Sequence, residues 1–226
     1  MERISKYDLV LFDLDGTLLN TIPDLGNAVN HALGIRDLPL HGMDEYPAMV
    51  GHGIRNLVIN ALPESLRGKD DFVDEVLADF SSYYTAHIDD ETRPYPGIPE
   101  TISDLQDSGC ALAVVSNKFQ AGTVKLIKRF FPSINWLAVM GNMEGMPLKP
   151  DPAIVQMIFK SYASLNGDII PKAVMVGDSS SDIRTGKNAG ISTIAVTWGY
   201  RSASSLGEAD IMAHNVEELR AALLNG

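Results

Sequence analysis

The sequence of 226 residues contains little cysteine and no long apolar run. Because Cys110 is its single cysteine, the chain can form no intrachain disulfide, and a reducing compartment suits it. No apolar stretch approaches the ~20 residues that span a bilayer. The first residues, MERISKYDLVLF, lack the pattern of a secretory signal peptide. We therefore expect a cytoplasmic protein with no membrane partner.

Basic side chains are also scarce, with 18 Lys and Arg against 29 Asp and Glu and a net charge of -11. An acidic protein repels the phosphates of nucleic acids, so we expect no nucleic-acid partner. An anionic small substrate would need local cations or a metal to overcome the overall charge. Hydrophobic residues make up 45% and charged residues 21%, which is ordinary for a globular protein. The sequence carries no signal for the oligomeric state.

Short apolar runs alternate with segments of helical periodicity over most of the chain. The predicted strands are Leu9–Phe12, Ala111–Val115, Trp136–Met140, Ala173–Val176 and Ile191–Val196. Strands and helices that alternate in this way predict an α/β fold, a Rossmann-like parallel sheet with helices on both faces. Ligands bind such sheets at the carboxyl ends of the strands.

The region 20–92 breaks this alternation, because it has helical patterns and no comparable strand. The helical patterns cover Pro23–Gly34, Tyr46–Leu62 and Asp70–His87, and the proline-rich run RPYPG follows at 93–97. We therefore predict a small all-helical domain at 20–92, inserted after the first strand. Residues 1–19 and 93–226 would then form the α/β core.

Asp13 and Asp15 directly follow the first predicted strand, and Gly16 permits the chain to turn there. Two carboxylates this close repel each other, so a cation is expected between them. A hard divalent ion such as Mg²⁺ prefers oxygen ligands of this kind, and an aspartate can also act as a covalent nucleophile. The alternative for the pair alone is a turn stabilised by a side-chain hydrogen bond.

Two further motifs follow predicted strands and have a weaker signal. Ser116 and Asn117 end the second strand, where a hydroxyl and backbone N–H groups can hold a phosphate oxygen. Lys149 lies in KPDP, directly before a predicted helix, and can neutralise a phosphate or a carboxylate. Taken singly, an ordinary turn and a solvated lysine explain these residues as well.

Asp178 and Asp182 belong to GDSSSD, which follows the fourth predicted strand. Their spacing of four residues brings the carboxylates close together if the loop winds into a helix. Helix capping by Asp178 or Ser179 is the alternative for this motif alone. All four motifs fall at one edge of one predicted sheet, and this coincidence favours a shared site over four unrelated turns.

The order DLDGT, SNK, KPDP, GDSSSD resembles the haloacid dehalogenase-like hydrolase superfamily, and the resemblance extends from Phe12 to about Leu219. The first and last motifs carry most of the specificity. The helical region between the first two motifs has the place of the cap domain of that family. The segments MVGHGIRNLVINAL (49–62) and AGISTIAVTWGY (189–200) are most similar to the phosphoglycolate phosphatases and their close relatives.

The resemblance implies a role for each motif residue. Asp13 would attack phosphorus and bind the metal. Asp15 would protonate the leaving alkoxide, activate water, and offer its backbone carbonyl to the metal. Ser116 and Asn117 would hold the phosphoryl group, and Lys149 would stabilise its charge.

The last motif would complete the metal site. Asp178 would ligate Mg²⁺ directly, and Asp182 would orient the metal's waters or Lys149. The implied function is a Mg²⁺-dependent phosphatase that acts on a small phosphorylated metabolite, 2-phosphoglycolate first, through a phospho-aspartyl intermediate. A pyrophosphatase, a nucleotidase or a β-phosphoglucomutase of the same superfamily is the alternative. A non-catalytic protein that binds a phosphate ligand on this fold is the alternative from another class.

The choice of substrate is expected to lie with the cap, in the segment Gly51-His52-Gly53-Ile54-Arg55. Two glycines permit a loop to approach a ligand closely, and Arg55 can pair with a substrate carboxylate. The alternative for Arg55 is an exposed arginine on a helix face. His52 is not expected to bind the metal, since no second ligand lies near it in the sequence.

Overall fold

The computed structural model describes residues 4–51 and 53–225, and the chain divides into two compact units. The larger unit comprises Met1–Leu19 and Pro94–Gly226, and the smaller unit comprises Asn20–Arg93. Between them the chain crosses twice, and the crossings pair as a ribbon of β3 (Leu19–Asn20) and β4 (Arg93–Pro94). Within the described residues, no helix is both long enough and apolar enough to cross a membrane.

The larger unit is built on a parallel sheet of six strands in the order β6-β5-β2-β7-β8-β9. The strands are β2 (Leu9–Phe12), β5 (Ala111–Phe119), β6 (Trp136–Asn142), β7 (Ala173–Gly177), β8 (Ser192–Val196) and β9 (Ile211–Ala213). A short antiparallel pair, β1 (Ile4–Ser5) with β10 (Leu224–Asn225), joins the two ends of the unit.

Strand β2 lies in the middle of the sheet and is fully buried. Leu9 and Leu11 belong to an apolar cluster that includes Val155 and other residues of α7 (Ala153–Asn166). Because side chains alternate along a strand, Val10 and Phe12 point to the opposite face. A strand covered on both faces needs apolar residues at every position, which explains the unbroken run LVLF.

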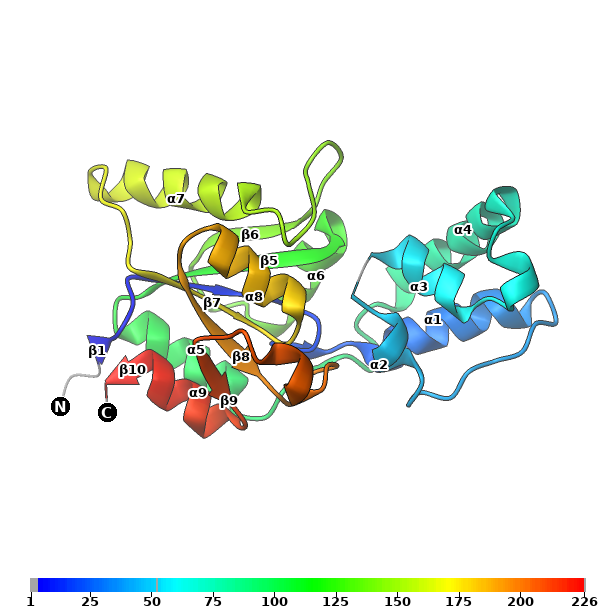
Figure 1. Ribbon diagram of the computed structural model, residues 1–226, viewed down its shortest axis with the longest axis horizontal. Helices are drawn as coiled ribbons and strands as arrows, with labels where there is room; N and C mark the ends of the chain where they lie inside the picture. The colour runs from blue at the N-terminus through cyan, green and yellow to red at the C-terminus, as the bar shows by residue number, and fades with distance from the viewer. Residues whose placement is uncertain (1–3, 52, 226) are drawn as a thin grey trace. The chain divides into compact units, whose positions relative to one another are not determined.

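Helices cover both faces of this sheet. Figure 1 shows α7 on one side of the strands and α5 and α9 on the other. The remaining helices of the unit are α5 (Ile98–Asp107), α6 (Gln120–Phe130), α8 (Ser180–Asn188) and α9 (Val216–Leu223), with a 3₁₀ turn, η2, at Ala203–Leu206. The predicted α/β class, with a parallel sheet between helical layers, is confirmed. Asn215 caps α9, since its side chain accepts a hydrogen bond from the Glu218 N–H.

The smaller unit is helical, with α1 (Ile22–Gly34), α2 (Tyr46–Met49), α3 (Ile54–Ala61), the 3₁₀ turn η1 (Glu64–Leu66) and α4 (Asp70–His87). A single helix over Tyr46–Leu62 was a wrong prediction, because α2 and α3 are separate. Gly51 and Gly53 have φ values of 121° and 84°, which no right-handed helix accommodates. The glycines therefore end one helix and begin the next.

Two strands differ from the prediction, and the difference in β5 affects the site. Strand β5 continues four residues past Val115 and so carries the motif SNK on the strand itself, where a turn had been the competing interpretation. Strand β9 was missed, because three residues are too few for a periodic signal.

We expect the burial of β2 to dominate the stability of the larger unit. Leu11→Ala should lower the free energy of unfolding by about 2–5 kcal/mol, since it leaves a cavity in a core covered on both faces. Urea unfolding followed by tryptophan fluorescence measures this change, because Trp136 and Trp198 both lie in the larger unit. The control Leu165→Ala, at a side chain 73% exposed, should cost less than about 0.5 kcal/mol. Equal losses of unfolding free energy in the two variants would show that the burial of β2 does not dominate the stability of the larger unit.

Candidate active site

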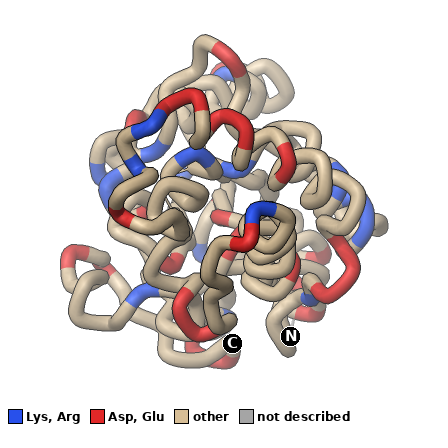
Figure 2. The backbone as a smooth tube through the Cα atoms, turned by 90° about the vertical axis from the view of Figure 1, so that its right-hand side faces the viewer, with Lys and Arg blue, Asp and Glu red and all other residues tan. Residues whose placement is uncertain are grey.

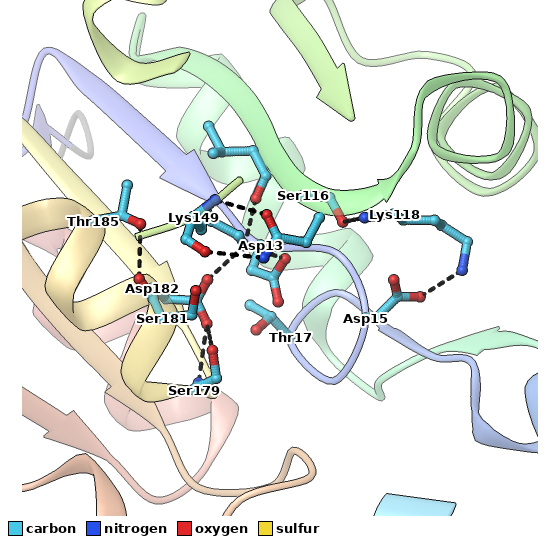
Figure 3. Close-up of polar contacts among 12 residues, drawn as sticks. Asp13, Asp15, Thr17, Ser116, Lys118, Lys149, Ser179, Ser181, Asp182 and Thr185 are labelled. Carbon is cyan, nitrogen blue, oxygen red and sulfur yellow. Dashed lines mark hydrogen bonds and ion pairs between the residues drawn. The ribbon is translucent and has the colours of Figure 1, made fainter. Parts of the chain in front are cut away.

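Three motifs far apart in the sequence meet at the carboxyl end of the sheet, around the ammonium group of Lys149. Its Nζ donates to Asp13 Oδ1 at 2.7 Å, to Asp182 Oδ1 at 2.6 Å and to the Val115 carbonyl at 2.8 Å. These three bonds use all the donors of an ammonium group. Figure 3 shows Lys149 reaching both carboxylates. Lys149 is therefore held in one position between the ends of β2, β5 and α8.

The charged side chains of this group shift one another's pKa values. Burial alone would lower the pKa of the Lys149 ammonium, but the Asp13 and Asp182 carboxylates outweigh burial and raise it above its usual range. Burial raises the pKa of the Asp13 carboxyl well above its ordinary value of 3.8, Asp182 adds to the rise, and Lys149 opposes it. A further cation near Asp13 would favour its ionised form.

Asp178 lies beside this cluster and is almost fully buried. Its Oδ1 accepts a hydrogen bond from the Thr17 hydroxyl at 3.4 Å, and its Oδ2 accepts one from the Tyr200 N–H at 2.7 Å. Burial and the charge of Asp182 raise its pKa to about 7. A Cβ at Gly16 or Gly199 would come within 2.4 Å of this carboxylate. Both positions must be glycine for the carboxylate to fit between them.

One carboxylate oxygen each from Asp13, Asp178 and Asp182 lie within 4.8 Å of one another. Lys149 supplies one positive charge to these three acidic groups, which leaves the cluster short of positive charge. Hard oxygen donors with excess negative charge are the ligands that Mg²⁺ prefers. Asp182 Oδ1 is bonded to Lys149 and its Oδ2 accepts from the Ser179 N–H and hydroxyl at 3.0 and 2.6 Å. Asp13 and Asp178 are thus the better candidates for direct metal contact.

Asp182 has a second task at the start of α8. Ser179 is the N-cap of this helix, and its N–H and hydroxyl both donate to Asp182, the third helical residue, in a capping box. Of the two capping residues that the sequence left open as an alternative, Asp178 and Ser179, Ser179 is the one in the cap position. Capping and site formation are therefore not exclusive here: one carboxylate does both. A Cβ at Gly177 would lie 2.3 Å from the Asp182 side chain, so this residue too must be glycine.

Ser116 and Asn117 lie where the sequence predicts, at the end of β5. The Ser116 hydroxyl is buried and accepts a hydrogen bond from the Lys118 N–H at 3.1 Å. The Asn117 side chain bonds the backbone of Lys149 twice: Oδ1 accepts from its N–H at 2.9 Å, and Nδ2 donates to its carbonyl at 3.3 Å. The Asn117 side chain therefore holds the loop that presents Lys149, and its backbone is the part left to contact a phosphate.

Asp15 lies apart from the acidic cluster. Its side chain is half-buried and turned toward Lys118, with Lys118 Nζ donating to Asp15 Oδ1 at 3.0 Å (Figure 3). The side chains of Asp13 and Asp15 thus lie in separate environments, Asp13 beside Lys149 and Asp15 beside Lys118. The side chain of Asp15 does not belong to the group of carboxylates that could bind a metal. The contact of its backbone carbonyl with the metal stays a prediction.

The segment that is predicted to choose the substrate belongs to the smaller unit. Gly51 and Gly53 have positive φ values, and Gly53 directly precedes α3. His52 lies outside the described residues. The Arg55 guanidinium pairs with Asp74 and, at 3.0 Å, with Asp70, both on α4. This pairing matches the alternative of a helix-face arginine, and the role of Arg55 toward a substrate stays a prediction.

Three contributors to the site have no assigned role in the sequence reasoning. Lys118 stands in the motif SNK, and its charge next to two predicted site residues was an available signal. Thr17 stands in DLDGT, directly after the turn. Tyr200 donates its backbone N–H to Asp178, and a backbone contact of this kind has no side-chain pattern in the sequence.

Two buried lysines lie in the site of this acidic chain. Figure 2 shows the Lys and Arg positions interspersed with more numerous acidic ones along the backbone. Lys149 and Lys118 are both buried, while most charged side chains are exposed. Their charges offset part of the negative charge of Asp13, Asp15, Asp178 and Asp182 at the carboxyl end of the sheet, so an anionic ligand would need a further cation there.

Comparisons with known proteins were consistent with this geometry. A family model described as haloacid dehalogenase-like hydrolase matches residues 10–196. The phosphoglycolate phosphatase of Mesorhizobium japonicum is 36% identical, with 85% of this chain and 83% of that protein covered. That of Caulobacter vibrioides is 34% identical, with 91% and 86% covered. A solved structure from Lactobacillus delbrueckii subsp. bulgaricus has a TM-score of 0.86 at 29% identity, with 98% of this chain and 100% of the other covered.

We expect Asp178 to make the metal-free protein less stable as the pH rises. Its pKa in the folded chain, about 7, lies above the ordinary value of 3.8. The folded chain therefore holds a proton that the unfolded chain releases between these values. The resulting stabilisation is complete below pH 3.8 and is lost as the pH rises through about 7. Asp178→Asn removes this dependence and should be the more stable protein at pH 8, by on the order of 2–4 kcal/mol.

Urea unfolding in EDTA at pH 5, 6, 7 and 8 measures this difference. The advantage of Asp178→Asn should grow with pH and level off above about 7. The exposed Asp168 provides the control, since Asp168→Asn should follow the pH dependence of the unmodified chain. An advantage of Asp178→Asn that is independent of pH would contradict the raised pKa.

Proposed function

The chain belongs to the haloacid dehalogenase-like hydrolase family, and from this premise we propose that it is a Mg²⁺-dependent phosphatase. The proposed reaction is the hydrolysis of a small phosphomonoester, 2-phosphoglycolate, through a phospho-aspartyl intermediate. The observation that carries the proposal is the placement of Asp13. Lys149 orients its Oδ1, and within the described residues no hydrogen bond is made to its Oδ2. One oxygen is thus oriented and the other is available to react.

In the first step, we propose that Asp13 attacks phosphorus and the bond from phosphorus to the ester oxygen breaks. Phosphoryl transfer needs alignment and neutralisation of charge more than any other contribution. Lys149 supplies a fixed positive charge beside Asp13, and the Ser116 hydroxyl can donate to a phosphoryl oxygen. Asp15, protonated from solvent, gives its proton to the leaving alkoxide.

In the second step, Asp15 takes a proton from water, and the resulting hydroxide attacks the phospho-aspartate. The bond from phosphorus to Asp13 breaks, which releases inorganic phosphate, restores the Asp13 carboxylate and leaves Asp15 protonated, as it was before the first step. Two carboxylates can divide these tasks only where their environments differ. Asp13 is buried among Lys149 and Asp182, whereas Asp15 is half-buried beside Lys118, so the two environments do differ.

We propose that Asp13 and Asp178, with the backbone carbonyl of Asp15, hold Mg²⁺. When bound, the ion supplies positive charge that keeps Asp13 ionised and neutralises the phosphoryl oxygens. Asp182 holds Lys149 in place. The raised pKa values of Asp13 and Asp178 support this assignment, because burial and neighbouring carboxylates disfavour the ionised forms and a bound cation would offset both effects.

The substrate is inferred from the relatives, two of which are named phosphoglycolate phosphatase at 34–36% identity. We also propose that residues 20–92 act as the cap of the enzyme and that the segment of Gly51, Gly53 and Arg55 takes part in the choice of substrate. A cap that closes on a bound substrate would exclude water from the phosphoryl group.

A phosphate-release assay with purified protein tests the function. With Mg²⁺, 2-phosphoglycolate should give a higher kcat/KM than pyrophosphate, nucleoside monophosphates or β-glucose 1-phosphate. Asp13→Asn should lower kcat on the best substrate by about 10³-fold or more, because an amide is no nucleophile toward phosphorus. Asp168→Asn, outside the site, should keep full activity. Activity of Asp13→Asn near that of the unmodified chain would exclude a phospho-aspartyl route.

The same panel separates the alternatives. Preferred release from pyrophosphate or from nucleoside monophosphates would change the substrate class. Conversion of β-glucose 1-phosphate without release of inorganic phosphate would indicate a mutase. No turnover of any ester with Mg²⁺ would indicate a protein that only binds phosphate ligands.

Mg²⁺ should also stabilise the folded chain. A ligand that binds only the folded state adds about 2.7 kcal/mol at 100 times its Kd, so the melting temperature should rise with MgCl₂. Asp178→Asn should abolish most of this rise, because it removes a proposed ligand. NaCl of equal ionic strength is the control for screening. An equal rise in the two proteins would place the metal elsewhere.

A further inference from the structure

Lys118, which is buried, forms an ion pair with the half-buried Asp15. Lys118 is 6% exposed, and its Nζ lies 3.0 Å from Asp15 Oδ1. A lysine loses much of its hydration on burial, and an opposite charge nearby offsets this cost. Asp15 therefore compensates the charge of Lys118 in the structure.

The two buried lysines of the site serve different carboxylates. Lys149 contacts Asp13 and Asp182, where the phosphoryl group is proposed to bind. Lys118 contacts Asp15 instead, and Figure 3 shows Asp15 turned toward Lys118 and away from Asp13. Since Asp15 has to reach the oxygen of the leaving group, its carboxylate has to turn away from Lys118 during the reaction.

When Asp15 acts as the proton donor at the ester oxygen, Lys118 therefore loses the negative charge with which it pairs in this structure. A second anionic group on the substrate, bound at Lys118, would replace the lost charge. A neutral group would not, and the separation of Asp15 from Lys118 would then add to the cost of reaction. The position of Lys118 beside Asp15 puts it on the leaving-group side of the phosphorus.

Building on the proposed function, we propose that Lys118 determines specificity for phosphoesters whose leaving group carries a negative charge. The anionic group of the substrate takes the place of Asp15 at Lys118, and Asp15 turns to the ester oxygen. In 2-phosphoglycolate one methylene separates the ester oxygen from the carboxylate, so both ends of the leaving group fall within one short region of the site. Lys118 thus pairs with Asp15 before the substrate binds and with the substrate's carboxylate afterwards.

A matched pair of substrates tests this exchange. In 2-hydroxyethyl phosphate a hydroxymethyl group replaces the carboxylate of 2-phosphoglycolate, so the two esters differ in one charge. The unmodified enzyme should favour 2-phosphoglycolate in kcat/KM. Lys118→Met keeps the length of the side chain and removes its charge. It should reduce the ratio of the two kcat/KM values by about 10- to 100-fold, the usual effect of a bond to a charged group.

Two further variants serve as controls. Lys118→Arg keeps the charge and should retain most of the preference. Lys128→Met makes the same change at an exposed lysine on α6 and should leave both kcat/KM values unchanged. The ratio between two esters is independent of the fraction of folded enzyme, so a partly unfolded variant still gives a valid result.

The outcomes separate this inference from the function on which it rests. If the unmodified enzyme releases phosphate from 2-phosphoglycolate and Lys118→Met loses activity on both esters by the same factor, Lys118 has a structural role and the inference is wrong. Equal kcat/KM values for the two esters in the unmodified enzyme would overturn it without any variant. Hydrolysis of neither ester would overturn the proposed substrate itself, and the inference with it.

Discussion

The arrangement of the site depends on one interaction, the three hydrogen bonds that the Lys149 ammonium donates to Asp13, Asp182 and the Val115 carbonyl. Two buried carboxylates this close to one another are stable only with a positive charge between them. Lys149 supplies that charge and, through it, ties together the ends of β2, β5 and α8. Loss of this one ammonium would leave Asp13 and Asp182 buried and repelling each other.

The sheet makes this interaction possible because its strands are parallel. The ends of β2, β5 and β7 fall at the same edge, so residues more than 100 positions apart in the sequence become neighbours. The unbroken apolar run of β2 gives the sheet its rigidity, and glycines at the ends of the strands give the carboxylates their space. Gly16, Gly177 and Gly199 each lie so close to a carboxylate that a methyl group would collide with it. Rigidity and close approach are therefore supplied by different residue types.

Much of this could be predicted from the four motifs together and from their order along the chain. The family, the enzyme class and the α/β fold are confirmed. They could be predicted because four motifs with polar or charged residues follow predicted strands in an order that is specific to the family. Asp13, Lys149, Asp178 and Asp182 do converge in the structure. The break between α2 and α3 was missed because an apolar pattern outweighed two glycines, and β9 because it is short. Lys118 received no role although it stands in the motif SNK, because the sequence did not show that its ammonium reaches Asp15.

The sequence by itself determined which chemical groups are present and at which edge of the sheet they lie, because local residue patterns mark where each strand begins and ends along the chain. Only the tertiary structure decided which group pairs with which. Lys149 pairs with Asp13 and Asp182, Lys118 pairs with Asp15, and Asn117 holds the backbone of Lys149. Such pairings depend on distances across the sheet and on burial, and neither is encoded in the spacing of residues along the chain.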